Sequence, residues 1–334
     1  MNAPSPAIVF ETLNAYQRSN ALRGAIELDL FTAIGEGNSS VASIAARIQA
    51  SEKGARVLCD LLTVIGFLTK QDGQYSLTPD SAAFLNRHSP AYIGASAAFL
   101  GDPRVTSGFD DIAAVVRRGG TLTREGGEVE ANGELWIEFA RSMATLMAMP
   151  AELLAKAIGA DAAQQWKVLD IAAGHGMFGI AIAKHSPDAQ VVAVDWAPVL
   201  SVAQENAAKH GVASRFSIIP GSALEVDLGS GYDVVVIANF LQLLDVPAIA
   251  NLLGKIWTAL APAGRVVTLG FIPNQDRVSP PGDAAFGLIA LAMTAGGDAY
   301  TFAEYERMFR EAGFARSELD QLRPSPQRIV VSYK

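Results

Sequence analysis

Apolar residues follow one pattern before about residue 160 and another after it. In the first part they recur every three or four positions over residues 7–34, 38–49 and 51–68, the spacing of helices that bury one face. Residues 68–78 then form two short extended runs around Asp72 and Gly73, a pair typical of a hairpin turn. Three helical segments followed by a hairpin predict a winged-helix arrangement.

A second helical stretch, residues 135–159, contains Pro150. Because proline lacks a backbone N–H and interrupts helical hydrogen bonding, we expect Pro150 to join two helices. Residues 119–134 before it are rich in Gly and Glu and predict an exposed loop.

From Lys167 onward, short runs rich in Val and Ile alternate with helical segments. Near-continuous apolar strands indicate burial on both faces, and the alternation predicts a doubly wound α/β sheet. Strands are expected at residues 167–172, 190–196, 215–221, 232–240, 264–272 and 327–334, and helices at 177–186, 199–211, 246–260 and 301–314.

Composition limits the class of protein. The 334 residues suffice for two domains, and the net charge of −8 disfavours a nucleic-acid or anionic-membrane surface. The single cysteine, Cys59, excludes a disulfide framework and suits a reducing compartment. No basic-then-apolar leader follows Met1, and the apolar run at 284–297 is shorter than the roughly 18 residues of a spanning helix. We expect a soluble cytoplasmic protein in which residues 284–297, apolar on every side, are buried.

A glycine-rich loop, Gly174-x-Gly176-x-x-Gly179, lies between the first of these strands and a helix. Such a loop lets a ligand approach the backbone at a helix N-terminus. Asp195 ends the next strand, where a carboxylate can bind ribose hydroxyls. Both features fit a nicotinamide dinucleotide and S-adenosylmethionine (SAM) equally well.

Asp170, at the end of the first strand, favours SAM. A carboxylate at the mouth of the loop would repel a pyrophosphate, whereas it would attract the sulfonium and ammonium groups of SAM. The alternative is that Asp170 only caps a turn.

Several segments together resemble the two-domain SAM-dependent O-methyltransferases of plant phenylpropanoid and bacterial natural-product pathways. They are "ALRGAIELDLFTAI", "RVLCDLLTVIGFL", "GQYSLTPDSAAFL", "VLDIAAGHG", "VVAVDW", "PGSALEVDL", "NFLQLLD", "LAPAGRVV" and "TFAEYERMFREAGF". The resemblance implies a Rossmann-like class I SAM methyltransferase sheet with helices on both faces, preceded by a mainly helical winged-helix dimerisation domain. Residues 1–105 would form the dimerisation domain of a homodimer. Residues 106–334 would bind SAM, with 106–160 as a helical linker that lines the cavity.

The resemblance also implies site residues. The cofactor set is Asp170, Ala172, Gly174, Gly176, Asp195, Trp196, Ser222, Ala223 and Asn239. The substrate set is Phe139, Met143, Met147, Phe240, Leu243, Phe286, Ile289 and Met293. For the residues before 150 the alternative is plain core, and for those after 280 it is a core or dimer helix. An apolar wall of this kind suits a flat, hydrophobic small molecule, such as an aromatic one.

One departure from the family concerns catalysis. Gln242 stands where the family carries a histidine base, Ala238 where it carries a lysine, and the supporting acids are missing near Gly270 and Asp298. A positioned base is worth roughly 10²–10⁴ in rate. Three interpretations stay open. Gln242 can orient an acceptor that needs no strong base: an acidified phenol, a thiolate, a ring nitrogen or an electron-rich carbon. Another group, from the partner subunit or from His175, can replace the base, although His175 can equally only shape the loop. The fold can also serve non-methylating chemistry.

The competing class is a SAM-responsive, winged-helix DNA-binding regulator. The segment at the recognition-helix position offers few basic residues, Lys53, Arg56 and nearby Lys70, where DNA binding needs several phosphate contacts. The four histidines and one cysteine show no metal-ligand spacing, so no metal is expected. The favoured partners are a small-molecule substrate and a second copy of the chain, with no nucleic acid and no membrane.

Overall fold

The structure is a computed structural model that describes residues 4–122, 133–161 and 163–334. The chain divides into two compact units, Met1–Gly101 and Asp102–Lys334. The boundary expected after residue 105 falls inside the first helix of the second unit, α8 (Pro103–Thr106). Among the described helices, none is both long and apolar enough to cross a membrane. Most of the loop expected at 119–134 lies outside the described residues.

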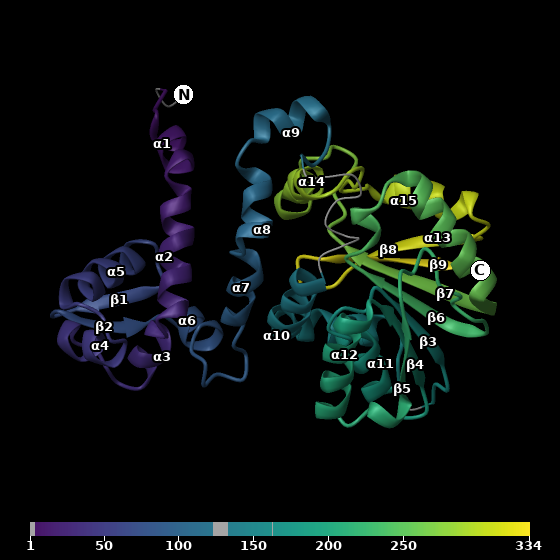
Figure 1. Cartoon of the computed structure of the whole chain (residues 1–334), viewed down its shortest axis with the longest axis horizontal. Coiled ribbons are helices and arrows are strands. Elements are labelled where there is room, and N and C mark those ends of the chain that lie inside the picture. The colour runs from purple at the N-terminus through teal and green to yellow at the C-terminus, as the bar shows by residue number, and fades with distance from the viewer. Residues whose placement is uncertain (1–3, 123–132, 162) are drawn as a thin grey trace. The chain divides into compact units, whose positions relative to one another are not determined.

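The first unit is built from helices and one hairpin (Figure 1). Its elements are α1 (Ala7–Leu13), α2 (Ala15–Glu27), α3 (Leu30–Gly35), α4 (Val41–Arg47), α5 (Glu52–Val64), β1 (Leu68–Gln71), β2 (Gln74–Leu77), α6 (Pro79–Phe84), η1 (Gly94–Ser96) and α7 (Ala97–Leu100). Asp72 and Gly73 form the turn between β1 and β2 with φ angles of 50° and 78°, as the hairpin signal predicts. The helical spacing over residues 7–34 produces three helices, with breaks at Asn14 and at Asp29, whose φ is 57°.

Cys59 lies in the core of this unit with Leu30, Ile44, Leu62 and Tyr75, all fully buried. Burial raises the pKa of the Cys59 thiol to about 11. The thiol therefore stays protonated and acts as a small apolar core group.

The second unit is a seven-stranded sheet with strand order β5-β4-β3-β6-β7-β9-β8. The strands are β3 (Lys167–Ile171), β4 (Gln190–Asp195), β5 (Phe216–Pro220), β6 (Tyr232–Ala238), β7 (Leu260–Gly270), β8 (Arg316–Gln321) and β9 (Arg328–Tyr333). The first five are parallel, and β9 is antiparallel to both of its neighbours. Strand order reverses direction between β3 and β6, and the carboxyl ends of such strands are where doubly wound sheets bind ligands.

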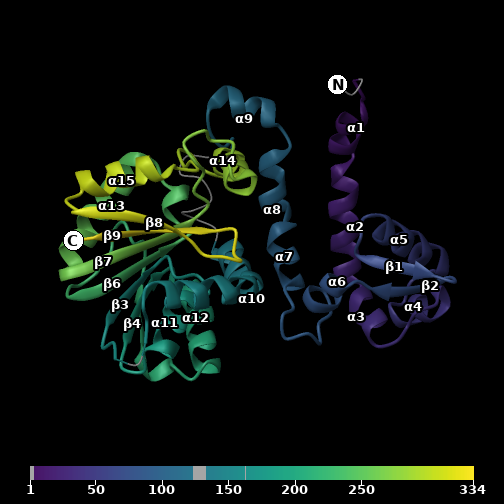
Figure 2. The ribbon, with the colours of Figure 1, turned by 180° about the vertical axis from the view of Figure 1, so that it is seen from behind.

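Helices cover both faces of this sheet (Figures 1 and 2). The long helix α10 (Gly133–Ala157) packs on α11 (Met177–His185) and α12 (Ala197–Lys209) on one face. On the other face, α13 (Val246–Ala259) and α15 (Phe302–Glu311) bury Leu252, Leu253, Tyr305 and Phe309 against the strands. The remaining helical elements of the unit are η2 (Ser107–Phe109), α9 (Ile112–Arg118), η3 (Ala213–Arg215), η4 (Leu241–Leu243) and α14 (Pro281–Met293).

Three details differ from the pattern-based expectations. The joint expected at Pro150 is wrong: α10 is continuous through it, because contacts with α11 and α12 outweigh one missing hydrogen bond. The segment at 284–297 is only partly buried, since Leu288 and Ile289 of α14 are 46% and 41% exposed. Strand β8 was not expected, because this largely exposed edge strand has the sequence RSELDQ and carries no apolar run.

Candidate active site

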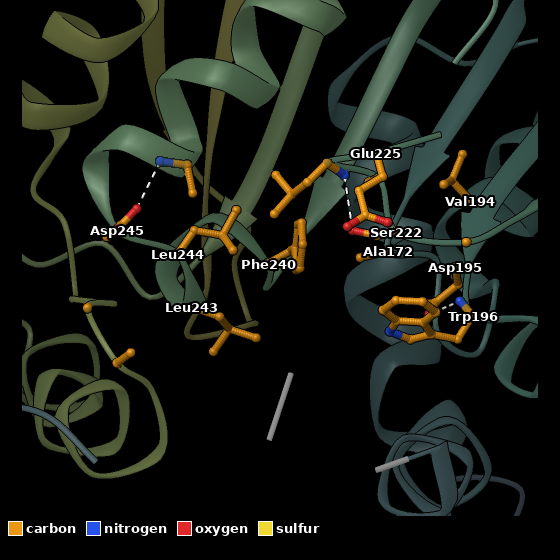
Figure 3. A pocket seen from close by; sticks show the side chains of 16 residues that line it. Ala172, Val194, Asp195, Trp196, Ser222, Glu225, Phe240, Leu243, Leu244 and Asp245 are labelled. Atoms are coloured by element: carbon orange, nitrogen blue, oxygen red, sulfur yellow. Dashed lines mark hydrogen bonds between the residues drawn. The ribbon is translucent and has the colours of Figure 1, made fainter. Parts of the chain in front are cut away.

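A cavity of about 490 Å³ opens at the carboxyl ends of β3, β4, β5 and β6 (Figure 3). It lies where the sheet topology predicts a ligand site. The lining residues are Ala172, Val194, Asp195, Trp196, Gly221, Ser222, Ala223, Leu224, Glu225, Phe240, Leu243, Leu244, Asp245, Ala248, Ala295 and Gly296. Seven of the residues expected from the sequence are thereby brought together: Ala172, Asp195, Trp196, Ser222, Ala223, Phe240 and Leu243.

The glycine loop needs its glycines for conformation and for packing. Gly174 and Gly176 have φ angles of 55° and 73°, in the left-handed region that side chains disfavour. A Cβ added to Gly176 would lie 3.0 Å from the Cβ of Ala203 and 3.2 Å from the Phe216 ring. The loop therefore packs directly against α12 and the start of β5, and these contacts restrict its conformation.

Asp195 connects this loop to the next strand. Its Oδ2 accepts a hydrogen bond from the Gly174 N–H at 2.8 Å, and its Oδ1 accepts one from the Trp196 N–H at 2.7 Å. Burial raises the pKa of the Asp195 carboxyl, while both hydrogen bonds oppose that shift. The side chain lines the cavity, so its remaining lone pairs can accept hydrogen bonds from ribose hydroxyls.

Asp170 lies beneath the loop, and its expected position at the rim of the site is wrong. It is 1% exposed, and its Oδ2 accepts a hydrogen bond from the Gly179 N–H in the first turn of α11 at 2.9 Å. Burial, together with the charge of Asp195, raises the pKa of the Asp170 carboxyl to about 7. Asp170 does not line the cavity; it joins the end of β3 to the helix that follows the loop.

His175 shapes the loop. Its Nδ1 accepts a hydrogen bond from the Met177 N–H at 3.1 Å, and its ring stacks on Phe139 with centroids 6.1 Å apart. Its backbone carbonyl accepts a hydrogen bond from the Asn206 amide at 2.9 Å. Burial lowers the pKa of His175 to about 4, so the ring is neutral and serves as an acceptor within the protein.

The turn after β5 forms another wall of the cavity. The Leu224 N–H donates to the Ser222 hydroxyl at 3.3 Å, and Ala223 is buried. Lys255, on α13, donates to the backbone carbonyls of Ala223 and Val226, both at 2.9 Å. The same turn brings Glu225 into the lining, a residue that no sequence motif indicates.

Gln242, which the resemblance places where the family carries a histidine, is turned into the protein. Its side chain is 2% exposed, and its Oε1 accepts a hydrogen bond from the Phe271 N–H at 3.2 Å. A Cβ at position 270 would lie 2.7 Å from that oxygen, so Gly270 provides the space for it. Asp298, near the position where the resemblance implies a supporting acid, forms an ion pair with Arg277 at 3.2 Å.

The other expected residues lie outside the cavity lining. Phe139 of α10 lies over Gly174, and a Cβ at position 174 would be 3.4 Å from its ring. Asn239, with φ of 55°, accepts a hydrogen bond from Gln327 at 2.7 Å and faces the sulfur of Met147. Met143, which lies on α10 with Phe139 and Met147, is buried.

The expected substrate residues of α14 are spread over its surface. The Phe286 ring stacks on Phe271 at 4.9 Å, the sulfur of Met293 lies near Gly108, and Ile289 is exposed. None of the three lines the cavity, so a direct contact with substrate stays a prediction.

The charged residues that line the cavity indicate what charge a bound ligand would carry. Three carboxylates, Asp195, Glu225 and Asp245, line the cavity, and among its described lining residues there is no Lys or Arg. Lys255 directs its ammonium group to backbone carbonyls. An acidic cavity repels a pyrophosphate and attracts a sulfonium and an ammonium, so these residues fit SAM. Within the described part of the chain, no cluster of His, Cys, Asp and Glu could hold a metal ion.

Fold and site together define a class I SAM-dependent methyltransferase. Residues 10–87 match the O-methyltransferase dimerisation domain, and residues 168–264 match the methyltransferase domain. A crystal structure of a candidate O-methyltransferase from Nostoc punctiforme PCC 73102 is 51% identical, covers 100% of both chains and superposes with a TM-score of 0.94. The chain belongs to this O-methyltransferase family, and its cofactor is S-adenosyl-L-methionine.

Two further relatives are more distant. The 3-hydroxy-5-methyl-1-naphthoate 3-O-methyltransferase of Streptomyces sahachiroi is 25% identical over 312 residues, which are 92% of this chain and 89% of that protein. Human N-acetylserotonin methyltransferase, solved in complex with SAM, is 19% identical with a TM-score of 0.85, and the match covers 100% of this chain and 99% of that one. The latter likeness shows the shared fold.

Proposed function

We propose that the protein methylates a small, flat, largely apolar metabolite by holding its nucleophile in line with the methyl group of SAM, without a histidine base. Bound SAM supplies an electrophilic methyl group on a sulfonium. Asp195 would bind the ribose, the loop from Ala172 to Gly176 would lie along the methionine part, and Trp196 would pack near the adenine. The apolar side chains of Phe240 and Leu243 would contact the acceptor (Figure 3).

The position of Gln242 carries this proposal. An amide cannot take up a proton usefully, and its oxygen is already engaged by the Phe271 N–H. Among the described lining residues none carries an imidazole, amine, thiol or phenol group. Of the three lining carboxylates, Asp195 and Asp245 already accept backbone hydrogen bonds, and Glu225 lies on the turn after β5, at the end of the cavity proposed for the cofactor. An ordinary phenol, with a pKa of about 10, is only about one part in a thousand ionised at pH 7.

The acceptor must therefore supply its own nucleophilicity. An acidified phenol, a thiolate, a ring nitrogen or an electron-rich carbon meets that requirement, and correct alignment alone can supply much of the rate. The relative from Streptomyces sahachiroi acts on a hydroxynaphthoate, which supports a flat aromatic acceptor from natural-product metabolism.

Incubation of the full-length protein with SAM and a panel of phenols, thiols, N-heterocycles and carbon nucleophiles tests the proposal. We expect added methyl mass on acceptors that ionise near neutral pH or need no deprotonation. Methylation confined to phenols of high pKa, at rates normal for an enzyme with a base, would contradict the mechanism. Calorimetry in which NADH binds tightly while SAM and S-adenosylhomocysteine do not would contradict the function itself and favour other chemistry.

We also propose a cytoplasmic homodimer. The dimerisation-domain match begins at residue 10, and α1 and α2 expose Ile8, Phe10, Leu13 and Tyr16 by 61–72%. A monomer with this much exposed apolar surface would be prone to association. Light scattering should give twice the chain mass of 35.2 kDa, and a monomer would contradict the proposal.

The DNA-binding alternative finds little support in the first unit. Arg56 and Lys70 both pair with Asp60, at 3.0 and 2.6 Å, which neutralises two of the three basic side chains near the expected recognition helix. A mobility shift of duplex DNA at low salt would revive that alternative.

A further inference from the structure

We propose that Arg328 and Asp283 form a buried ion pair that positions α14 and, through this helix, the acceptor end of the cavity. Both are positioning residues, because neither lines the cavity and their effect passes through the helix. The inference rests on the proposed function, since it takes the acceptor to bind beside Leu243. It assigns residues that control acceptor binding and leave cofactor binding unaffected.

Helix α14 buries few of its own side chains. Of its residues, Asp283, Ala290 and Ala292 are buried, while Leu288 and Ile289 are exposed. Two alanine side chains bury little apolar area, so they stabilise the position of the helix only weakly. The third buried residue is a carboxylate in the first turn, and a buried charge is costly unless it is paired.

The carboxylate of Asp283 depends on one cation. It is 1% exposed, and its Oδ2 lies 3.6 Å from the Nε of Arg328. That oxygen accepts no hydrogen bond from any residue that the structure describes. Burial raises the pKa of Asp283 to about 6, while the charge of Arg328 opposes the shift. The charge of Arg328 therefore offsets part of the cost of burying this carboxylate.

Arg328 is held in place by contacts that do not involve Asp283. Its Nη1 donates to the Ile272 carbonyl at 2.9 Å and to Asn274 Oδ1 at 2.8 Å. Its Nε donates to the Oε1 of Gln321, the last residue of β8, at 3.2 Å. Arg328 itself begins β9, and Ile272 and Asn274 follow β7, so the guanidinium is fixed on three strands of the sheet. If the pair is broken, α14 is therefore the element that is released.

The other end of α14 leads into the cavity wall. Thr294, at its C-cap, accepts a hydrogen bond from the Thr121 N–H at 3.0 Å. The next two residues, Ala295 and Gly296, line the cavity. A Cβ added to Gly296 would lie 2.8 Å from the Cβ of Asp245. This wall therefore packs closely against the segment that carries the proposed acceptor contacts.

That segment lies at the acceptor end of the cavity. Figure 3 shows Leu243 and Asp245 across the cavity from Trp196, which would pack near the adenine. Along α14, the Phe286 ring stacks on Phe271 with centroids 4.9 Å apart. A displacement of α14 would change both this stack and the wall that follows the helix, so the space for the acceptor would change while the nucleotide end would not.

Asp283→Asn tests the pair with little change in shape, and Arg328 keeps its three other acceptors. At pH 8, where Asp283 is ionised, we expect the KM for 4-nitrophenol, an acidified phenol, to rise about 10-fold, the order of one coupling between neighbouring side chains. The value of kcat and the calorimetric affinity for S-adenosylhomocysteine should change by no more than about 2-fold, because only acceptor binding is weakened.

Hydrogen exchange of the full-length protein reports on the helix without an acceptor. The backbone amides of α14 should exchange about 10-fold faster in Asp283→Asn, because losing the anchor favours local opening. Asp80→Asn is the matched control: Asp80 is an exposed carboxylate in the first turn of α6, so the substitution removes only a charge near a helix N-terminus. It should change neither the exchange of α14 nor the KM.

Arg328→Gln tests the direction of the dependence. It leaves the buried carboxylate without its cation, so the KM and the exchange of α14 should rise more than in Asp283→Asn. Combining the two substitutions should then reverse part of that effect, because the unpaired charge is gone. A further loss in the double variant, equal to that of Asp283→Asn alone, would show that the two side chains act independently and would overturn the pair.

The outcomes separate this inference from the proposed function. An unchanged KM, or unchanged exchange of α14, in Asp283→Asn that still transfers methyl groups would overturn this inference alone. Failure of the native protein to bind S-adenosylhomocysteine or to methylate an acceptor would overturn the proposed function, and the exchange measurement would still decide whether the pair anchors α14.

Discussion

The carboxylate of Asp195 accepts a hydrogen bond from the Gly174 N–H at 2.8 Å, so the end of β4 holds the loop that follows its neighbour β3. One side chain thus has two roles: it fixes the loop along which the methionine part of the cofactor would lie, and it faces the cavity where the ribose would bind. Loop shape and ribose recognition are therefore coupled at a single carboxylate.

Asp195→Asn should weaken binding of S-adenosylhomocysteine by about 10- to 100-fold, because hydrogen bonds to a charged acceptor are worth roughly 1.5–3 kcal/mol. Calorimetry measures the affinity. Asp188→Asn, an exposed residue just before β4, is the control and should bind normally. An unchanged affinity in Asp195→Asn would remove Asp195 from the cofactor site.

Gly176→Ala should lower the free energy of unfolding by about 1–3 kcal/mol, since it combines a φ of 73° with a Cβ 3.0 Å from Ala203. Gly254→Ala is the matched control: Gly254 lies within α13 with no atom near an added Cβ. That substitution should stabilise the protein by roughly 0.5–1 kcal/mol. Urea unfolding of both variants checks the pair, and equal effects would contradict the packing argument.

The pH dependence of stability should carry a contribution from Asp170. Burial raises its pKa to about 7 in the folded protein from the ordinary value of about 3.8, so folding favours the neutral acid. The resulting stabilisation is fully present below about pH 4 and is lost as the pH rises through 7. A shift of this size corresponds to at most about 4 kcal/mol.

Asp170→Asn isolates this contribution, because an uncharged amide does not ionise. Relative to the native protein, the variant should gain stability steadily between pH 4 and pH 7 and stay level above pH 8, as measured by urea unfolding. The difference between the two proteins cancels the opposing effect of His175, whose pKa of about 4 makes stability fall as the pH drops below 6.5. A difference independent of pH would show that Asp170 is not held neutral.

Gln242→His should change acceptor preference more than cofactor affinity. The ratio of kcat/KM for ordinary phenols to that for acidified phenols should rise, while the affinity for S-adenosylhomocysteine changes by no more than about 3-fold. Gln190→His, at the far end of β4, controls for the added imidazole. Loss of cofactor binding with no change in preference would indicate that Gln242 has only a structural role.

Much of the second unit could be predicted because its signals are local. Buried parallel strands require continuous runs of apolar residues, such as those around Val168 and Val235. The glycines of the loop likewise indicate a tight turn between a strand and a helix. The loop and the end of the next strand also predicted Asp195, which lines the cavity, whereas Ala172 and Phe240 were expected from the family resemblance. The continuity of α10 through Pro150 could not be predicted, since it depends on contacts with helices that come later in the chain.

Glu225 had no sequence signal for a different reason. A glutamate in a polar turn is usually a solvated surface residue, and only the folded chain shows that this turn borders a cavity. Lys255, which holds the turn, lies 32 residues after Ala223, on another element. Similarly, the placement of Asp170 beneath the loop depends on its bond to Gly179, which the linear motif does not reveal.

Gly270 and Gln242 limit how this site can change during evolution. A side chain introduced at position 270 first would collide with the glutamine amide, since even its Cβ would lie 2.7 Å from Oε1. A lineage that acquires an acid at 270 would move the Gln242 amide away from the Phe271 N–H that it accepts from, so a second change at 242 would relieve the lost hydrogen bond. We expect the two positions to covary among homologues, with glutamine accompanied by glycine and bulkier residues at 270 found only beside other residues at 242.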